Sequence, residues 1–340
     1  MKATTEAAPV AKTPHEKSTL REKVAVAVPW AGWLCLAGLL ALPALSGSRY
    51  IVYLGTLIAL EAALATSLNV VMGYAGQFAM SHAAFYGFGA YASALLVTSL
   101  GLNFWAAIPL AMLGAGVLAG VIGYPALRYT GGVHLALITF AFGELARLIA
   151  ANWDALTGGP MGMRVMYSPG SFFGVNLSSA KGLYWLAAAM LLATLLVAGA
   201  IQRSRFGRGL VALREDETLA SFLGINVVGY KLASYVISSM LATMVGCAYA
   251  PIMNFISPEM LSAQDTISLI GVLVIGGMGT FAGPIVGALI FFGIPEMLRV
   301  ALLYRLVVLG LVIVVAVLLM PEGIVGMLQR RMSRWKRGLA

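Results

Sequence analysis

Long runs of apolar residues recur along this chain, and they constrain its fold more than any other feature of the sequence. A helix that crosses a bilayer needs about 20 predominantly apolar residues. The runs of suitable length are 26–45, 50–72, 83–100, 104–127, 133–150, 183–201, 231–255 and 303–320. They predict an all-α integral membrane protein that crosses the membrane many times.

Charged residues are rare, which indicates that lipid is the solvent for most of the chain. Of the 340 residues, 60% are hydrophobic and 10% are charged. A soluble domain carries about 25% charged residues. The net charge of +9 would suggest nucleic acid in a soluble protein, but here the basic residues cluster at the two ends and in one loop. We therefore expect membrane lipid, and no nucleic acid, around this chain.

The positions of the basic residues predict the orientation in the membrane. Sixteen of the 22 lysines and arginines lie in or beside four stretches, which are the tail 1–25, the loop 202–229, the tail 323–340 and the end of the run 104–127. Because basic residues accumulate in cytoplasmic segments, we expect these stretches in the cytoplasm and the loop 151–181 outside. Both termini are then cytoplasmic, and the number of crossings is even.

The apolar stretch 266–298 decides the number of crossings. It is too long for one straight span, and it is interrupted at 276–279 and at Gly283-Pro284. A single crossing there would place the basic C-terminal tail outside, against the charge rule. We predict about ten transmembrane helices within a membrane domain 26–322, with eight helices plus a re-entrant hairpin as the alternative.

The first apolar run, 26–45, has a second interpretation. Ala44-Leu45-Ser46 resembles a signal-peptide cleavage site. The polar segment before the run is long for a signal peptide, so we favour an uncleaved first helix.

Two glycine-rich segments interrupt apolar runs, one near 73–82 and the other near 276–284. Both contain Gly-x-Phe-Ala, which begins at Gly76 in the first segment and at Gly279 in the second. Helix breaks at membrane depth are tolerated where they line protein or a water-filled cavity, and in transporters they often mark the solute path. For any single glycine, close helix packing is the alternative. The glycines predicted to form functional breaks are Gly73, Gly76, Gly276, Gly277 and Gly279.

Few polar side chains lie within the apolar runs, and a charge there is expected to face the protein interior. Glu144 and Arg147 are three residues apart on one predicted helix, so we expect them to pair. Glu61 has no obvious local partner and is expected to meet another helix or another subunit. The candidates for a polar solute path are Asn69, Gln77 and His82.

The sequence contains no recognisable enzyme or metal motif. It has no His-Glu-x-x-His, no Gly-x-Ser-x-Gly and no phosphate-binding loop. Its two cysteines, Cys35 and Cys247, lie in separate apolar runs. We expect no catalytic residue, no metal and no cofactor in this chain, so that any use of ATP would require another subunit.

The loop 202–229 has the pattern of a short amphipathic helix. Acidic residues at 215–217 suit a helix N-terminus, and Gly224 suits a helix end. Leu219, Phe222 and Leu223 fall on one face. Such a helix either rests on the bilayer surface or docks in a groove of a partner.

A series of short motifs runs through the membrane part. They are Leu68-Asn69, 73–77, 81–85, 135–144, 157–159, 223–226, 256–258, 275–280, Gly283-Pro284, Pro295-Glu296 and Met320-Pro321. In this order they resemble the LivM-type permeases of branched-chain amino acid ABC importers, from about residue 50 to 328.

This resemblance implies a heteromeric importer in the bacterial inner membrane. A LivH-like second permease would complete the translocation path, and an external amino-acid-binding protein would deliver the solute. Two LivG/LivF-like ATPase subunits would use ATP and Mg²⁺. The segment around 214–226 would be the coupling helix that docks on an ATPase. Its expected members are Arg214, Glu215, Asp216, Glu217, Leu219, Ala220, Phe222, Leu223, Gly224, Ile225 and Asn226.

The coupling segment departs in part from the pattern Glu-Ala-Ala-x-x-x-Gly that ABC permeases often show. Ala220 and Gly224 match it, whereas Thr218 and Leu219 stand in the first two places. The expected solutes are branched-chain or related hydrophobic amino acids, with urea, amides or aromatic compounds as alternatives. Two different kinds of transport protein also fit the apolar runs. One is a stand-alone secondary transporter, with Glu61 and Glu144 as its carboxylates, and the second is a passive channel.

Overall fold

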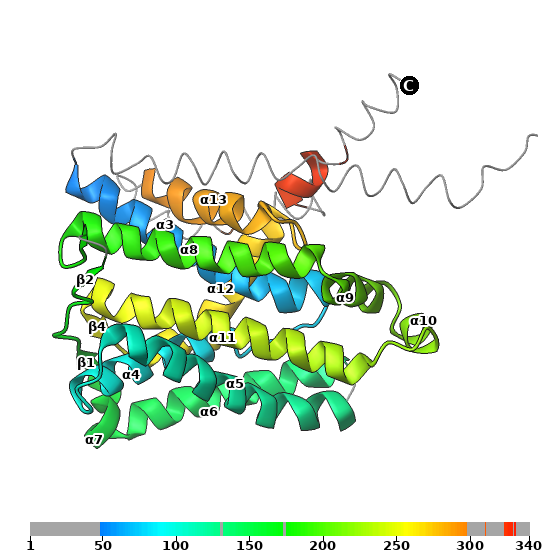
Figure 1. The fold of residues 1–340 in the computed structure, drawn as a ribbon, viewed down its shortest axis with the longest axis horizontal. Coiled ribbons are helices and arrows are strands. Elements are labelled where there is room, and N and C mark those ends of the chain that lie inside the picture. The colour runs from blue at the N-terminus through cyan, green and yellow to red at the C-terminus, as the bar shows by residue number, and fades with distance from the viewer. Residues whose placement is uncertain are drawn as a thin grey trace, which may run out of the picture.

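The chain forms a bundle of long helices that lie side by side (Figure 1). The structure, a computed structural model, describes residues 48–129, 132–172, 175–297, 310, 323–328 and 330. The first bundle helices are α3 (Arg49–Leu68), continued by the π-helical turn η1 (Asn69–Tyr74), α4 (His82–Thr98), α5 (Phe104–Tyr129) and α6 (Gly132–Asn152). The later ones are α8 (Ala180–Arg203), α11 (Val227–Met253), α12 (Ala263–Gly276) and α13 (Gly283–Met297).

Short elements connect the long helices at the two ends of the bundle. One end carries α7 (Asp154–Thr157), η2 (Gly159–Met161), β1 (Met163–Arg164), β2 (Ser171–Phe172), β3 (Val175–Asn176), β4 (Phe255–Ile256) and η3 (Pro258–Leu261). The opposite end carries α9 (Arg205–Glu215) and α10 (Glu217–Phe222) (Figure 1). The predicted external loop 151–181 and the predicted cytoplasmic loop 202–229 therefore lie at opposite ends.

The prediction of a mostly helical membrane protein is confirmed. Five helices of the described part are long and apolar enough to cross a bilayer, and they are Arg49–Tyr74, Phe104–Tyr129, Leu135–Asn152, Ala180–Arg203 and Val227–Met253. The chain is not purely α-helical, since β1 pairs with β4 and β2 with β3 in antiparallel two-residue ladders. The predicted helix 26–45, and nearly all of 303–320, lie outside the described residues.

Helix α11 is the centre of the bundle, where it packs against α3, α4, α5 and α8. Glycines bring its backbone close to that of α4: a Cβ on Gly89 would lie 2.1 Å from the carbonyl oxygen of Thr243. A Cβ on Gly246 would lie 1.9 Å from the carbonyl oxygen of Tyr86. Small residues at such contacts are typical of helix packing in membranes.

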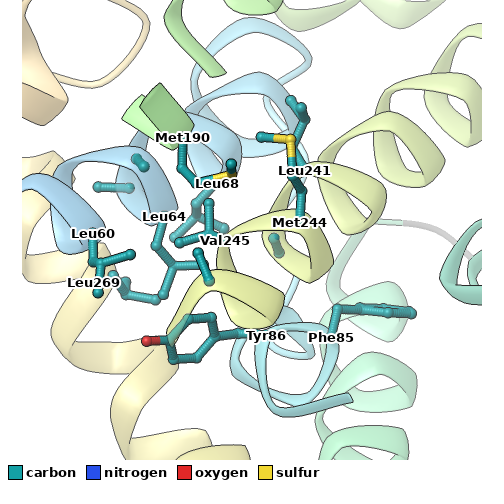
Figure 2. Packing of buried hydrophobic residues seen from close by; sticks show 14 of the residues in the cluster. Leu60, Leu64, Leu68, Phe85, Tyr86, Met190, Leu241, Met244, Val245 and Leu269 are labelled. Carbon is teal, nitrogen blue, oxygen red and sulfur yellow. The ribbon is translucent and has the colours of Figure 1, made fainter. Parts of the chain in front are cut away.

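Apolar side chains from four helices pack against those of α11 (Figure 2). Leu64 and Leu68 come from α3, Phe85 from α4, Met190 from α8 and Leu269 from α12. Because lipid is as apolar as these side chains, close packing rather than exclusion from water holds such a core together.

At the end that carries the β-ladders, Tyr167 lies beside the bundle helices rather than in a free loop. Its hydroxyl donates to Ser93 Oγ of α4 at 3.2 Å, and its ring packs on Phe104 of α5. Burial raises the pKa of Tyr167 to about 12. The segment after α7 is thereby attached to α4 and α5.

Helices α12 and α13 form an antiparallel hairpin. A Cβ on Gly276 would lie 1.9 Å from the carbonyl oxygen of Gly283, and one on Gly287 would lie 2.1 Å from that of Val272. Helix α12 has 14 residues, and the described part of α13 has 15. At about 1.5 Å per residue, α12 is shorter than the roughly 30 Å hydrocarbon core.

Candidate functional site

The first predicted break lies between α3 and α4. Helix α3 passes into the π-helical turn η1, and the chain is then non-helical until His82 begins α4. Gly76 has a φ of 68°, a left-handed conformation that favours glycine. Single turns of π-helix inside longer helices are frequent at functional sites.

The second predicted break lies at the tip of the α12–α13 hairpin. Helix α12 ends at Gly276 and α13 begins at Gly283. Thr280 organises the turn: its hydroxyl donates to the carbonyl oxygen of Gly277 at 2.8 Å and accepts from the backbone N–H of Gly283 at 3.0 Å. Both glycine-rich segments are therefore real helix breaks, as their sequences predict.

Asn69 joins the two breaks. Its side-chain oxygen accepts from the backbone N–H of Gly279 at 2.8 Å, and its side-chain nitrogen donates to the carbonyl oxygen of Thr280 at 3.0 Å. The side chain is 1% exposed. It thus satisfies two backbone groups that the second break frees, which lipid could not do.

The contact between the breaks leaves no room for larger residues. A Cβ on Gly73 would lie 1.9 Å from Asn69 Oδ1 and 2.6 Å from the backbone nitrogen of Gly279. Glycine is therefore needed at position 73 for space rather than for backbone conformation, since its φ is not in the left-handed region.

Arg214, near the end of α9, reaches the same place from the loop 202–229. Its guanidinium donates to the carbonyl oxygen of Gly73. The same guanidinium lies against Gly279, where an added Cβ would be 2.5 Å from Nη1, and its aliphatic stem lies against Gly76. We call this cluster the glycine junction, and its members are Asn69, Gly73, Gly76, Gly279, Thr280 and Arg214.

A second connection runs from α10 through α11 to the first break. Glu217 of α10 forms an ion pair with Lys231 of α11. The carbonyl oxygen of Lys231 accepts from Gln77 Nε2 at 3.1 Å, and Ser234 Oγ accepts from the same nitrogen at 2.9 Å. Both helices of the loop are therefore linked to the break between α3 and α4.

Helix α10 lies at one end of the molecule (Figure 1). Its apolar side chains are exposed. Leu219 is 59% exposed, Phe222 is 83% exposed and Leu223, just after the helix, is 73% exposed. Asp216 caps the helix, because its Oδ1 accepts from the backbone N–H groups of Thr218 at 2.8 Å and Leu219 at 2.9 Å. An exposed apolar cluster at a helix is typical of a docking surface.

The loop differs from the single helix around 214–226 that the sequence suggests. Arg214 and Glu215 end α9, and the extended backbone of Asp216, with φ −158° and ψ 111°, separates them from α10. Ala220 is buried and faces away from the exposed cluster. After Gly224 (φ 82°) and Ile225, Asn226 belongs to the next helix, whose N-terminus it caps by accepting from Gly229 N at 2.9 Å.

The remaining path candidates lie elsewhere. His82 Nε2 is 2.8 Å from Ser67 Oγ in a buried contact between α3 and α4. Gly276 and Gly277 lie at the tip of the α12–α13 hairpin, where they pack closely against Gly283. Gly277 also lies against Gly323 of the short helix 323–328. Val325 of that helix is buried against Ala282, so the predicted tail 323–340 begins inside packed structure.

The charged residues within the runs divide into a pair and a single carboxylate. Arg147 Nε donates to Glu144 Oε1 at 2.8 Å, which agrees with the predicted ion pair. Glu61 has no hydrogen bond or ion pair with any residue of the described part. Its helix α3 packs against α12, whose first turn carries a second acidic residue, Asp265. Sequence reasoning missed Asp265, because it lies at the edge of the apolar stretch 266–298 and reads as a loop residue.

A cavity of about 780 Å³ lies between α4, α5 and α6. Its lining is almost entirely apolar and includes Phe88, Leu113 and Leu145. Such a lining offers no partner to a solute with charged groups. Among the described residues, no group of three or more His, Cys, Asp or Glu side chains could hold a metal ion.

Comparison with known proteins gives a consistent result. Residues 50–317 match the family described as branched-chain amino acid transport system / permease component. The chain is 31% identical to the high-affinity branched-chain amino acid transport system permease protein LivM of Escherichia coli K12, over 86% of this chain and 74% of that protein. LivM of Salmonella typhimurium is also 31% identical, over 82% of this chain and 71% of the relative. The corresponding LivH of Escherichia coli K12 is 27% identical, over 80% of this chain and 92% of the relative.

Proposed function

This chain belongs to the family of branched-chain amino acid transport system permease components, and on that premise we propose that it is one permease subunit of a binding-protein-dependent ABC importer. Branched-chain or related hydrophobic amino acids are its proposed solutes. Urea, amides and aromatic compounds remain the alternative solutes within the same kind of importer.

One observation carries this proposal. The loop 202–229 holds both an exposed apolar cluster on α10 and the arginine of α9 that reaches the glycine junction. A stand-alone transporter or a passive channel has no need of an apolar docking cluster that is joined to helix breaks in distant parts of the sequence. A permease driven by separate ATPases needs both parts. The cluster Leu219, Phe222 and Leu223 offers the contact, and Arg214 offers the link.

In the proposed mechanism, α10 docks in a groove of an ATPase subunit, which binds ATP and Mg²⁺. Closure of the ATPase pair moves α9 and α10. Arg214 transmits this movement to the glycine junction, and the pair Glu217–Lys231 transmits it to Gln77. Because the breaks have no continuous helical hydrogen bonding, they are the points at which α3–α4 and α12–α13 can change their relative positions.

The proposed partners complete the machine. A LivH-like permease forms the other wall of the path, two LivG/LivF-like subunits hydrolyse ATP, and an external binding protein delivers the amino acid. The relatives named LivM and LivH support a pair of different permeases. The complex lies in the bacterial inner membrane, and this chain acts in transport rather than catalysis.

We also propose about ten crossings with both termini cytoplasmic, counting α12 and α13 as two short ones. The hairpin tip contacts Arg214, which lies in the loop with the cytoplasmic charge pattern. In the alternative of eight crossings, the hairpin enters from outside and its tip stays away from the cytoplasm. Met278 is 40% exposed at the hairpin tip, so labelling at this position distinguishes ten crossings from eight. With Cys35 and Cys247 replaced by Ala, Met278→Cys is expected to react with a membrane-impermeant maleimide from the cytoplasmic side.

The experiment that tests the function is purification of the tagged chain with its partners, followed by reconstitution into proteoliposomes. We expect an ATPase pair and a second permease to co-purify, and leucine uptake to require ATP and the binding protein. Phe222→Asp is expected to release the ATPases, because it places a charge in the apolar contact. Met161→Asp is the matched control, since Met161 is 85% exposed at the opposite end. Uptake by the chain alone without ATP would refute the proposal.

A further inference from the structure

Helix α6 lies at the outer edge of the bundle, on the side away from α8 (Figure 1). One side of the helix packs on the bundle through buried residues such as Leu135 and Thr139. The rest is open, since 22% of its candidate membrane span, Leu135–Asn152, is buried inside the chain, against 72% of Val227–Met253. The described chain therefore leaves most of α6 to be covered by lipid or by another protein.

The open side of α6 carries a charged pair near the middle of the span. Arg147 Nε donates to Glu144 Oε1 at 2.8 Å, and the side chains of Arg147 and Glu144 are 26% and 34% exposed. Charged groups at this depth are costly in lipid and normally face protein or water. A long basic side chain near a helix end can avoid this cost by extending to the membrane surface. Arg147 does not extend in that way, because it bonds to a residue three positions earlier, toward the middle of the span.

The pair also keeps hydrogen-bonding capacity for a partner. The two nitrogens of Arg147 that bond to Glu144, Nε and Nη2, both reach the same oxygen, Oε1. Among the described residues, no side chain or backbone group bonds to Glu144 Oε2 or to Arg147 Nη1. A carboxylate oxygen accepts a hydrogen bond and a guanidinium nitrogen donates one. The pair can therefore bind one further donor and one further acceptor.

Large apolar side chains surround the pair on the same side of the helix. Leu137, Phe140 and Leu148 lie seven or four positions from Glu144, which places them on its side of α6. They are 63%, 43% and 46% exposed. A water-filled path is lined with polar groups, which these three side chains do not provide. A protein contact, by contrast, combines an apolar surface with a few hydrogen-bonded polar groups.

The neighbouring helix α5 shows what a lipid-facing surface of this chain looks like. Its residues Leu113 and Val117 are 61% and 66% exposed, and α5 carries no charged residue before Arg128 in its last turn. Lipid suits such a surface, because no polar group is left without a partner. The exposed sides of α5 and α6 therefore differ in what can cover them.

We propose that Glu144, Arg147, Leu137, Phe140 and Leu148 form the surface of this chain that contacts the second permease. We call this surface the α6 face. Its charged pair bonds to a donor and an acceptor on a membrane helix of that subunit, and its apolar side chains pack around these bonds, as is typical of helix contacts in membranes. The inference rests on the proposed function, because that function supplies the second permease.

The first test is photo-crosslinking of the purified importer, with benzoylphenylalanine in place of Phe140. This probe keeps the aromatic ring of the residue that it replaces. We expect a covalent adduct with the second permease, identified by its mass. The same probe at Val117, in the middle of the lipid-facing side of α5, is the control and is expected to react with lipid alone. Reaction of the Phe140 probe with lipid alone, or with a second copy of this chain, would overturn the inference.

The second test removes the charged pair in the double variant Glu144→Leu with Arg147→Leu. On a lipid-facing helix this change removes costly charges and leaves the complex intact. At a subunit contact it leaves a donor and an acceptor of the partner unpaired, so we expect the amount of second permease retained during purification to fall about tenfold. Thermal unfolding of the variant chain in detergent is expected to match that of the unaltered chain, which separates loss of contact from loss of fold. Full retention of the second permease would overturn the inference.

Failure of the proposed function gives a different result from failure of this inference. In the first case, no second permease co-purifies with the unaltered chain. In the second case, the second permease co-purifies with the unaltered chain, but the probe at Phe140 does not reach it or the double variant retains it in full.

Discussion

Arg214 donates a hydrogen bond from its guanidinium to the carbonyl oxygen of Gly73, 141 positions earlier in the chain. The bond joins α9, in the loop 202–229, to the π-helical turn that continues α3. Gly73 also lies against Gly279 of the α12–α13 hairpin. One side chain from the loop therefore reaches both helix breaks of the bundle.

Replacement of Asn69 tests the contact between the breaks. Asn69→Leu leaves the backbone N–H of Gly279 and the carbonyl oxygen of Thr280 without partners in a buried position. We expect the free energy of unfolding to fall by about 2–4 kcal/mol, because each buried polar group left unpaired costs about 1–3 kcal/mol. Thermal unfolding of the purified protein in detergent measures this. Asn152→Leu, at the exposed end of α6, is the control and is expected to change stability by less than about 1 kcal/mol.

Replacement of Gly73 tests the close approach of the breaks. In Gly73→Ala the new Cβ overlaps Asn69 Oδ1 and crowds the backbone of Gly279. We expect a loss of about 1–3 kcal/mol in stability, typical of overpacking. Gly120→Ala in α5 is the matched control, since no atom lies within 4 Å of its added Cβ. Gly120→Ala is expected to be neutral or stabilising by up to about 1 kcal/mol, and equal losses in both variants would argue against a tight junction.

Charge reversal at Glu217 or Lys231 tests the second connection between the loop 202–229 and the bundle. Reversal of either charge is expected to reduce ATP-dependent uptake, because it separates α10 from α11. For Glu217→Lys the effect on stability is expected to stay within about 1 kcal/mol, since the Glu217 side chain is 55% exposed, whereas Lys231→Glu places a carboxylate where the side chain is 11% exposed and is expected to cost more. The double variant Glu217→Lys with Lys231→Glu is expected to recover uptake. No recovery in the double variant would show that the two charges do not act on each other.

Much of the fold could be predicted from the sequence because apolar length is a local property. The runs 50–72, 104–127 and 183–201 correspond to α3 with η1, to α5 and to α8. The positions of both helix breaks could also be predicted, because glycine marks a broken helix without reference to its neighbours.

The contacts of the junction could not be predicted in the same way. Asn69 and Gly279 are 210 positions apart, and the sequence does not indicate which buried amide meets which break. His82 has the same polar character as Asn69, yet it bonds to Ser67 in a different place. Arg214 looked like one of several loop arginines, and its contact with Gly73 depends on how α9 packs beside η1.

The most direct measurement is ATP hydrolysis and leucine uptake, recorded together on the reconstituted complex with Arg214→Ala. We expect the ATPases to remain bound and active while uptake falls about tenfold, within the usual range of coupling between sites. Arg208→Ala is the control, since Arg208 is exposed on the same helix and its side chain bonds only to the carbonyl oxygen of Arg203 among the described residues. Normal uptake with Arg214→Ala would contradict transmission through the glycine junction, and so would a loss that Arg208→Ala shares.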